Sequence, residues 1–331
     1  MSYHWIPIQA PSAGVRITQK KPFAASPVKA GGSIPDYLVS MTSVRRVDYS
    51  SNGPQNLNAC YMSDDGTKWF EYSANEDLIR GYVLTTPYDI STRVFSSNNY
   101  LTFDLQGLNQ NMYCMFVSND GLDLWISGSW SVPRIYRLQM SSAWDLSTLS
   151  YSGVNSIFSA PFPSGSSGGN TFHFRPDGGQ LWVAARSTSD GLAVIGSYLL
   201  NTPFDIDDTT PSNPLRMTFD EAGYPPEYGS LDNIKGITMN REGTVLLVTE
   251  NNGGNPEGIH QFNMSTPWDI QTMTYKSTFN LSYTVGGQTF NPPQRDNGQI
   301  IITPDGSIVT IAGGNEDNPN QGGFWQYETN V

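Results

Sequence analysis

Short apolar runs, separated by tight turns that carry an acid and a glycine, recur along the chain. Each of five segments has one apolar run, the turn and a second apolar run. They read ACYMSDDGTKWFEY (59–72), CMFVSNDGLDLWIS (114–127), FHFRPDGGQLWVAA (172–185), ITMNREGTVLLVTE (237–250) and IIITPDGSIVTIAG (300–313). The turn glycines Gly66, Gly121, Gly178, Gly243 and Gly306 are 55, 57, 65 and 63 residues apart. Because glycine takes positive φ without steric cost, each segment predicts a β-hairpin, and the spacing predicts a repeat.

A third and a fourth strand are expected after each hairpin. An apolar residue followed three positions later by an aromatic residue or leucine marks the third strand, as in Ile79-x-x-Tyr82 and Ile259-x-x-Phe262. In the first four repeats a turn sequence follows, namely TPYDI, SAWDL, TPFDI or TPWDI. A β-prone stretch such as 272–281 comes after it. Each repeat is therefore expected to form four antiparallel strands, one blade of an all-β, single five-bladed β-propeller.

The fifth repeat breaks off after Tyr327, before its turn and fourth strand. The segment 34–50 contains Pro35-Asp36, which loosely resembles the turn, and a β-prone stretch after it. We expect 34–50 to supply the closing strand of the last blade, so that 34–331 forms one propeller without open sheet edges. Residues 1–33, rich in Pro, Gly, Ala and Ser, are expected to form an extended N-terminal arm. The residues of this arm expected to contact neighbouring subunits are Trp5, Pro7 and Pro11.

The Asp-Gly hairpin, the aromatic third strand and the TPWDI-type turn together resemble propeller repeats of virion and tail proteins of tailed bacteriophages. The resemblance covers residues 34–331. It implies a non-enzymatic virion structural component, associated with a tail or capsid, with host-surface adhesion as a role that it could serve. The implied partners are other virion proteins, reached through the N-terminal arm and the long-loop face, and a host surface glycan.

Composition narrows the classes of partner and compartment. Eighteen Lys and Arg against thirty Asp and Glu give a net charge of −12, which excludes a broad basic surface for nucleic acid. No cationic stretch followed by an apolar core comes after Met1, so no signal peptide is expected. No apolar run is long enough to span a bilayer, so membrane insertion is not expected either. With only Cys60 and Cys114, we expect buried free thiols that point to opposite faces, and no metal or cofactor.

The long loops are the expected binding surface. Alternation of strand direction places the loops between second and third strands, together with the connections between blades, on one face of the propeller. Trp130 and Arg134 lie in the loop SGSWSVPR (127–134). Because indole rings stack on the apolar faces of sugars, these two residues support an alternative function as a glycan-binding, lectin-type propeller.

A second alternative is a glycoside hydrolase. Such enzymes use a pair of carboxylates, which in five-bladed propellers would lie on the innermost strands. The predicted first strands contain no Asp or Glu, and Asp232 and Asp296 lie just before two of them. Each is followed by asparagine, Asn233 or Asn297, so turn formation competes with catalysis as the interpretation. The spacing of Asn233 and Asn297 from their turn glycines would also place them in an approximate ring of carboxamides at the channel mouth, where bonding to loop backbone competes with ligand binding as the interpretation. The expectation is a protein that is not an enzyme.

Recurring side chains are expected to be structural. The acids beside the turn glycines, taken as turn residues, are Asp64, Asp120, Asp177, Glu242 and Asp305. The tryptophans at recurring positions, expected in blade packing, are Trp69, Trp125, Trp182, Trp144 and Trp268. His173 on a first strand and His260 on a third strand are interpreted as structural histidines.

Overall fold

The structure is a computed structural model in which most strands and short turns are described. The described residues are 36–38, 41–48, 57–73, 76, 78–102, 112–128, 134–157, 171–186, 192–206, 215–225, 231, 234–250, 258–281, 283–285, 288–290, 296–314 and 323–329. The expected N-terminal arm, with Trp5, Pro7 and Pro11, lies outside this part of the chain.

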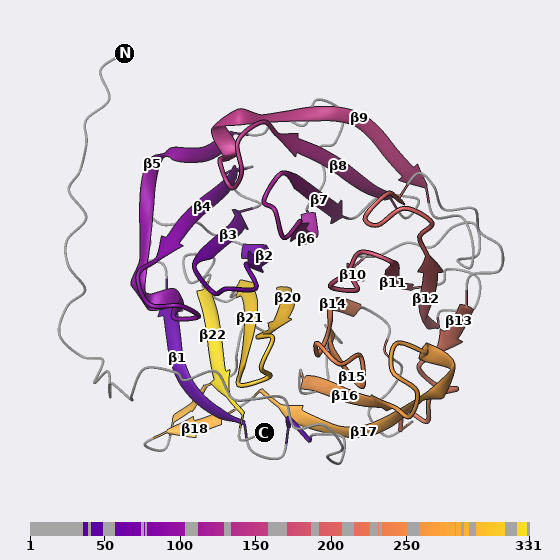
Figure 1. Ribbon diagram of the computed structural model, residues 1–331. Coiled ribbons are helices and arrows are strands. Elements are labelled where there is room, and N and C mark those ends of the chain that lie inside the picture. The colour runs from indigo at the N-terminus through magenta and orange to yellow at the C-terminus, as the bar shows by residue number, and fades with distance from the viewer. Residues whose placement is uncertain are drawn as a thin grey trace.

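Five four-stranded antiparallel sheets surround a central axis, which confirms the predicted all-β propeller (Figure 1). The first four blades are built from consecutive strands. They are β2 (Leu57–Met62), β3 (Lys68–Ser73), β4 (Leu78–Leu84) and β5 (Arg93–Thr102); β6 (Met112–Val117), β7 (Asp123–Gly128), β8 (Arg134–Met140) and β9 (Leu149–Ile157); β10 (Thr171–Phe174), β11 (Gln180–Arg186), β12 (Ala193–Leu199) and β13 (Leu215–Thr218); β14 (Ile234–Met239), β15 (Val245–Glu250), β16 (Gly258–Met264) and β17 (Met273–Asn280). In each blade the first strand is innermost (Figure 1).

The fifth blade combines both ends of the chain. Its inner strands are β20 (Asp296–Ile302), β21 (Ile308–Gly314) and β22 (Gly323–Glu328). The outer strand is β1 (Thr42–Asp48), which pairs antiparallel with β22 from Thr42 opposite Glu328 to Asp48 opposite Gly323. The prediction that the N-terminal segment closes the ring is therefore confirmed.

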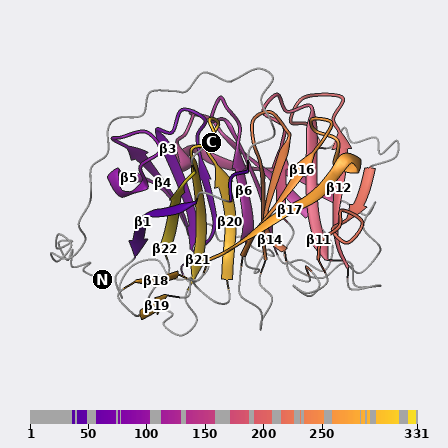
Figure 2. The same cartoon turned by 90° about the horizontal axis from the view of Figure 1, so that it is seen from below.

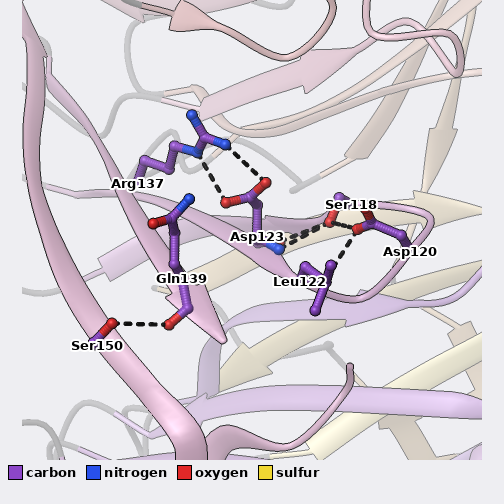
Figure 3. Close-up of polar contacts among 7 residues, drawn as sticks. All are labelled: Ser118, Asp120, Leu122, Asp123, Arg137, Gln139 and Ser150. Atoms are coloured by element: carbon purple, nitrogen blue, oxygen red, sulfur yellow. Dashed lines mark hydrogen bonds and ion pairs between the residues drawn. The ribbon is translucent and has the colours of Figure 1, made fainter. Parts of the chain in front are cut away.

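The predicted hairpin turns have glycine at positive φ, from 67° to 74°. Figure 3 shows the turn of the second blade, where Ser118 Oγ donates to Asp120 Oδ1 at 2.5 Å and the Leu122 N–H donates to the same oxygen at 3.0 Å. In the first blade the equivalent acceptor is Asp65, to which the Ser63 hydroxyl donates a hydrogen bond at 2.6 Å. Asp64 lies in this turn, as predicted, but the side chain that accepts the hydrogen bonds is that of Asp65, which directly precedes the glycine.

The TPWDI-type turns pack on these hairpins. The aromatic residue has positive φ in four blades, and its N–H donates to the turn glycine's carbonyl, as from Trp144 to Gly121 at 2.9 Å. The next residue, Asp145, caps a short 3₁₀ helix, η2 (Leu146–Thr148), by accepting the Ser147 N–H. Equivalent aspartates cap η1 (Ile90–Thr92) and η5 (Ile270–Thr272). The aromatic ring packs over the turn glycine, so the hairpin turn and the aromatic-Asp turn of each repeat stabilise one another.

Apolar side chains between neighbouring blades form the core. Trp69, Trp125 and Trp182 are completely buried, while Trp144 and Trp268 are partly buried and each packs against a core cluster. Recurring tryptophans thus pack the blades, as predicted.

Two connections expected to be irregular loops have structure of their own. Tyr224, from the connection after the third blade, is buried in the core, and β18 (Tyr283–Val285) pairs with β19 (Gln288–Phe290) before the fifth blade (Figure 2).

Candidate functional site

The structure describes only part of the predicted site. Trp130, Asp232 and Asn233 lie outside the described residues. Arg134 is the first residue of β8, and Asp296 and Asn297 begin β20. Asp296 and Asn297 were expected just before an innermost strand; the observed strand starts earlier and includes both. All three described positions lie at strand ends on the long-loop side of the propeller. They belong to different blades: Arg134 lies in the second blade, and Asp296 and Asn297 lie in the fifth.

Four of the five inner strands have an irregularity near their long-loop end, within the described residues. In β2, β6 and β14 one extra residue interrupts the pairing with the second strand, and in β20 two residues oppose one. The extra residues are Asn58, Tyr113 and Lys235, and Gly298 with Gln299. One member of each bulge falls eight residues before a turn glycine. Bulges re-aim side chains and are frequent beside binding sites, so this recurring position defines the candidate site.

Lys235 and Tyr113 meet across the axis. The Lys235 ammonium lies 4.6 Å from the centroid of the Tyr113 ring, although β6 and β14 belong to the second and fourth blades. The lysine is 6% exposed, so its charge is held largely out of water. A cation over an aromatic face is stabilised more strongly when it is desolvated. The pair therefore links the inner strands of the second and fourth blades at the long-loop end of the axis, with the tyrosine ring partly exposed.

Gln299 crosses the axis below this mouth. Its Oε1 accepts the backbone N–H of Met115 at 2.9 Å and that of Cys60 at 3.2 Å. Its Nε2 donates to the Met115 carbonyl at 2.7 Å. One neutral side chain from the fifth blade therefore binds the inner strands of the first and second blades.

The two cysteines face opposite neighbours. The Cys60 thiol lies 3.8 Å from the Gln299 carbonyl of the fifth blade, while the Cys114 thiol donates to the Phe172 carbonyl of the third at 3.3 Å. Both are buried free thiols, as predicted. Burial raises the pKa of Cys114 to about 12 and that of Cys60 well above its usual value. Neither thiol is suited to nucleophilic chemistry.

A second polar cluster lies in the fourth blade. His260 is buried, with Nε2 3.0 Å from Glu250 Oε1 and Nδ1 2.8 Å from Thr278 Oγ1. The Tyr275 hydroxyl pairs with Thr278 at 2.8 Å, and Tyr224 donates to Glu250 at 3.4 Å. These contacts join β15, β16 and β17 to the segment that leads into the fourth blade. They support the predicted structural role of His260, because each ring nitrogen has a partner within the fold.

The described residues contain little of the machinery that hydrolysis or metal binding needs. Among the described parts of the innermost strands, Asp296 is the sole carboxylate. No three His, Cys, Asp or Glu side chains in the described part of the chain could hold a metal ion together. In the same part no helix is long and apolar enough to cross a bilayer.

Sequence reasoning did not identify Lys235, Tyr113 or Gln299. Alignment of the repeats on their turn glycines would have placed Tyr113 and Lys235 at one position, where both interrupt otherwise apolar strands. Nothing in that alignment marks Gln299, because its partners are main-chain groups of other blades.

Comparisons with known proteins show the fold alone. No protein-family model matches the chain, and no curated protein matches its sequence. It is similar to the structure of an endo-arabinase from Bacteroides thetaiotaomicron VPI-5482 (13% identity, TM-score 0.55, covering 86% of this chain and 96% of that one). It also matches TolB from Acinetobacter baumannii (14% identity, TM-score 0.42), covering 89% of this chain and 65% of TolB. A luciferin-regenerating enzyme matches at 8% identity and TM-score 0.44, covering 86% of this chain and 96% of that one.

Proposed function

We propose that this protein is a non-enzymatic structural component of a bacteriophage particle, a rigid propeller associated with its tail or capsid. The non-enzymatic part of the proposal rests on the side chains that lie at the propeller axis. Gln299 ties three inner strands together there, and above it Lys235 lies on Tyr113. Glycoside hydrolysis needs two carboxyl groups about 5–10 Å apart on either side of a bound sugar. A neutral amide that is committed to three main-chain groups cannot act as one of them.

The phage assignment is supported by the repeat itself. The Asp-Gly hairpin and the aromatic-Asp turn, which resemble repeats of virion and tail proteins, form one interlocked unit in each of the first four blades. The N-terminal strand β1 covers the edge of β22 and so closes the ring, which suits a rigid platform that meets other proteins. The test is sedimentation of particles from cells that make the protein. It should co-sediment with intact particles, and its absence from them would refute the proposal.

A glycan-binding function is the second candidate, and the Lys235–Tyr113 pair favours it. The Tyr113 ring is partly exposed at the long-loop end of the axis, where a phenol ring can stack on the apolar face of a sugar, and the adjacent ammonium of Lys235 favours an acidic sugar. A glycan array probed with the intact protein checks this idea. Binding to acidic glycans that Tyr113→Ala removes, without cleavage of the glycan, would favour the lectin; uniform absence of binding would exclude it.

Hydrolysis remains the third candidate because of the likeness in fold to the endo-arabinase, which is an enzyme by name. Asp296, at the start of an innermost strand, is the residue to test. Incubation with arabinan and other polysaccharides should release no reducing ends. Release that Asp296→Asn abolishes would overturn the non-enzymatic proposal.

A further inference from the structure

Five side chains, one from the inner strand of each blade, surround the propeller axis two residues closer to the hairpin turns than Gln299. Each lies five residues before the turn glycine of its blade. Because side chains alternate along a strand, the five point to the same side of their strands, towards the next blade and the axis. We call them the axial ring, and they are Tyr61, Phe116, His173, Thr238 and Ile301.

The exposed part of the axial ring faces the axis. The aromatic rings of Tyr61 and Phe116 lie 5.3 Å apart, so members of neighbouring blades meet. Phe116, His173 and Ile301 are partly exposed, although they lie within innermost strands. The residues that pair with these three on the second strands are at most 1% exposed, namely Trp125, Trp182 and Thr310. Solvent therefore reaches the axial ring from the axis rather than from the outside of the blades.

Three polar groups of the axial ring have no hydrogen-bond partner among the described residues: the Tyr61 hydroxyl, the His173 imidazole and the Thr238 hydroxyl. Tyr61 and Thr238 are 6% and 4% exposed, so both are more than nine-tenths buried. Buried polar groups are ordinarily hydrogen-bonded, as Thr171 is to the Ile237 N–H at 3.2 Å elsewhere on the inner strands. Three unpartnered groups around one axis therefore leave hydrogen-bonding capacity for a bound molecule.

The axial ring is uncharged. Burial lowers the pKa of His173 to about 4, so the imidazole is neutral at physiological pH. Burial raises the pKa of Tyr61, as do the nearby carboxylates of Asp64 and Asp65, so the phenol keeps its proton. Phenol, hydroxyl and neutral imidazole each donate and accept hydrogen bonds. Beside them the partly exposed Phe116 ring offers apolar surface, a combination that fits a molecule with several hydroxyl groups and an apolar face.

The hairpin turns surround the approach to the axial ring. Burial raises the pKa of Asp64 in the first turn, and the positive charge of Arg241 in the fourth turn opposes that rise. The first and fourth blades are not neighbours, so these two side chains reach towards one another beside the axis (Figure 1). On the other side of the axial ring, Gln299 crosses the axis to Met115. A molecule that reaches the axial ring therefore enters past the short turns, at the end opposite the long loops.

We propose that the axial ring binds an uncharged sugar residue that enters from the hairpin-turn end of the axis. The three unpartnered groups bond its hydroxyls, and its apolar face lies against Phe116. This site is distinct from the Lys235–Tyr113 pair, which lies at the long-loop end of the axis. The inference goes beyond the structural role proposed above and holds whether or not the protein belongs to a particle.

Histidine resonances of the full-length protein report on the axial ring directly. The chain has three histidines, and His260 serves as an internal control because both of its ring nitrogens have partners. Long-range proton–nitrogen correlation spectra are recorded during titration with glucose, galactose, mannose, arabinose and N-acetylglucosamine. At least one of these sugars should shift the His173 signals saturably and leave those of His260 unchanged. Absence of a saturable His173 shift with every one of them would overturn the proposal.

Two variants that remove one hydroxyl each, Tyr61→Phe and Thr238→Val, test the contacts by isothermal titration calorimetry. Each should weaken binding by about five- to tenfold, the effect of one lost hydrogen bond. Neither should unfold at a lower urea concentration than the wild type, because the fold gives these hydroxyls no partner among the described residues. Tyr113→Phe at the long-loop end is the matched control and should bind as the wild type does.

Binding that Tyr113→Phe weakens, and that Tyr61→Phe and Thr238→Val leave unchanged, would place the sugar at the long-loop end and overturn the axial site. Unchanged binding in all three variants would overturn it as well. Neither result bears on the proposed structural component, which is tested by the sedimentation of particles. Conversely, absence from particles refutes that function and leaves the axial site intact.

Discussion

Tyr37 packs over Gly306, and a Cβ at that glycine would lie 2.6 Å from the Tyr37 Cε1 atom. In the other blades the covering ring comes from the same repeat as the glycine, as with Trp144 over Gly121. In the fifth blade it comes from the N-terminal segment instead. The Tyr37 N–H donates to Gln261 Oε1 at 2.9 Å, and the Thr329 hydroxyl takes over the bond to the Gly306 carbonyl. The closing segment thus binds the fourth and fifth blades together.

Gly306→Ala should therefore destabilise the protein by about 2–4 kcal/mol, since strain at a φ of 74° adds to the clash with Tyr37. Urea unfolding gives the free energy. Gly223→Ala is the matched control, because its φ is 81° but nothing lies within 4 Å of the added Cβ. It should cost about 1–2 kcal/mol. If the interpretation is right, Tyr37→Ala reduces the effect of Gly306→Ala to that of the control; an unchanged effect would show that the ring does not matter.

Gln299→Leu should cost about 2–4 kcal/mol, because the Cys60 and Met115 N–H groups and the Met115 carbonyl each lose a partner in a buried environment. Leucine has a similar volume, so loss of packing contributes little. Urea unfolding measures the change, with Gln271→Leu at an exposed position of η5 as the control. Equal free energies of unfolding for the two variants would contradict the interpretation that Gln299 links inner strands across the axis.

His173 should make the protein sensitive to mild acid. Burial lowers its pKa to about 4 from about 6.5. Because the folded-state pKa is the lower one, the unfolded chain takes up the proton first, and stability is lost as the pH falls from 6.5 towards 4. The loss is at most about 3 kcal/mol, since His173 is only partly buried. As the pH falls from 6.5 towards 4, the unfolding free energy of the wild type should decrease relative to that of His173→Gln. Parallel curves would show that His173 is not linked to folding.

Native protein should not react with a thiol reagent such as DTNB, whereas urea-unfolded protein should react at both cysteines. Both thiols are buried and have raised pKa values. The absorbance of the released thiolate measures the reaction. Rapid labelling of one thiol in the folded protein would show that an inner strand opens to solvent.

Much of the fold follows from the sequence because the repeat is carried by local chemistry. A glycine at positive φ, an acid beside it and an aromatic-Asp turn each leave a residue signature, and closure by the N-terminal segment followed from one incomplete repeat. The site was harder to predict, because a bulge adds one residue without changing the apolar pattern. Lys235 and Tyr113 lie in blades that are not neighbours, and Gln299 binds main-chain groups, which have no signature in the sequence.

The copy number of the protein in gradient-purified particles tests the central proposal most directly. Quantitative mass spectrometry against the major capsid protein should find a fixed number of copies per intact particle, unchanged by further purification. A protein that falls to background as the particles are purified would contradict a structural role.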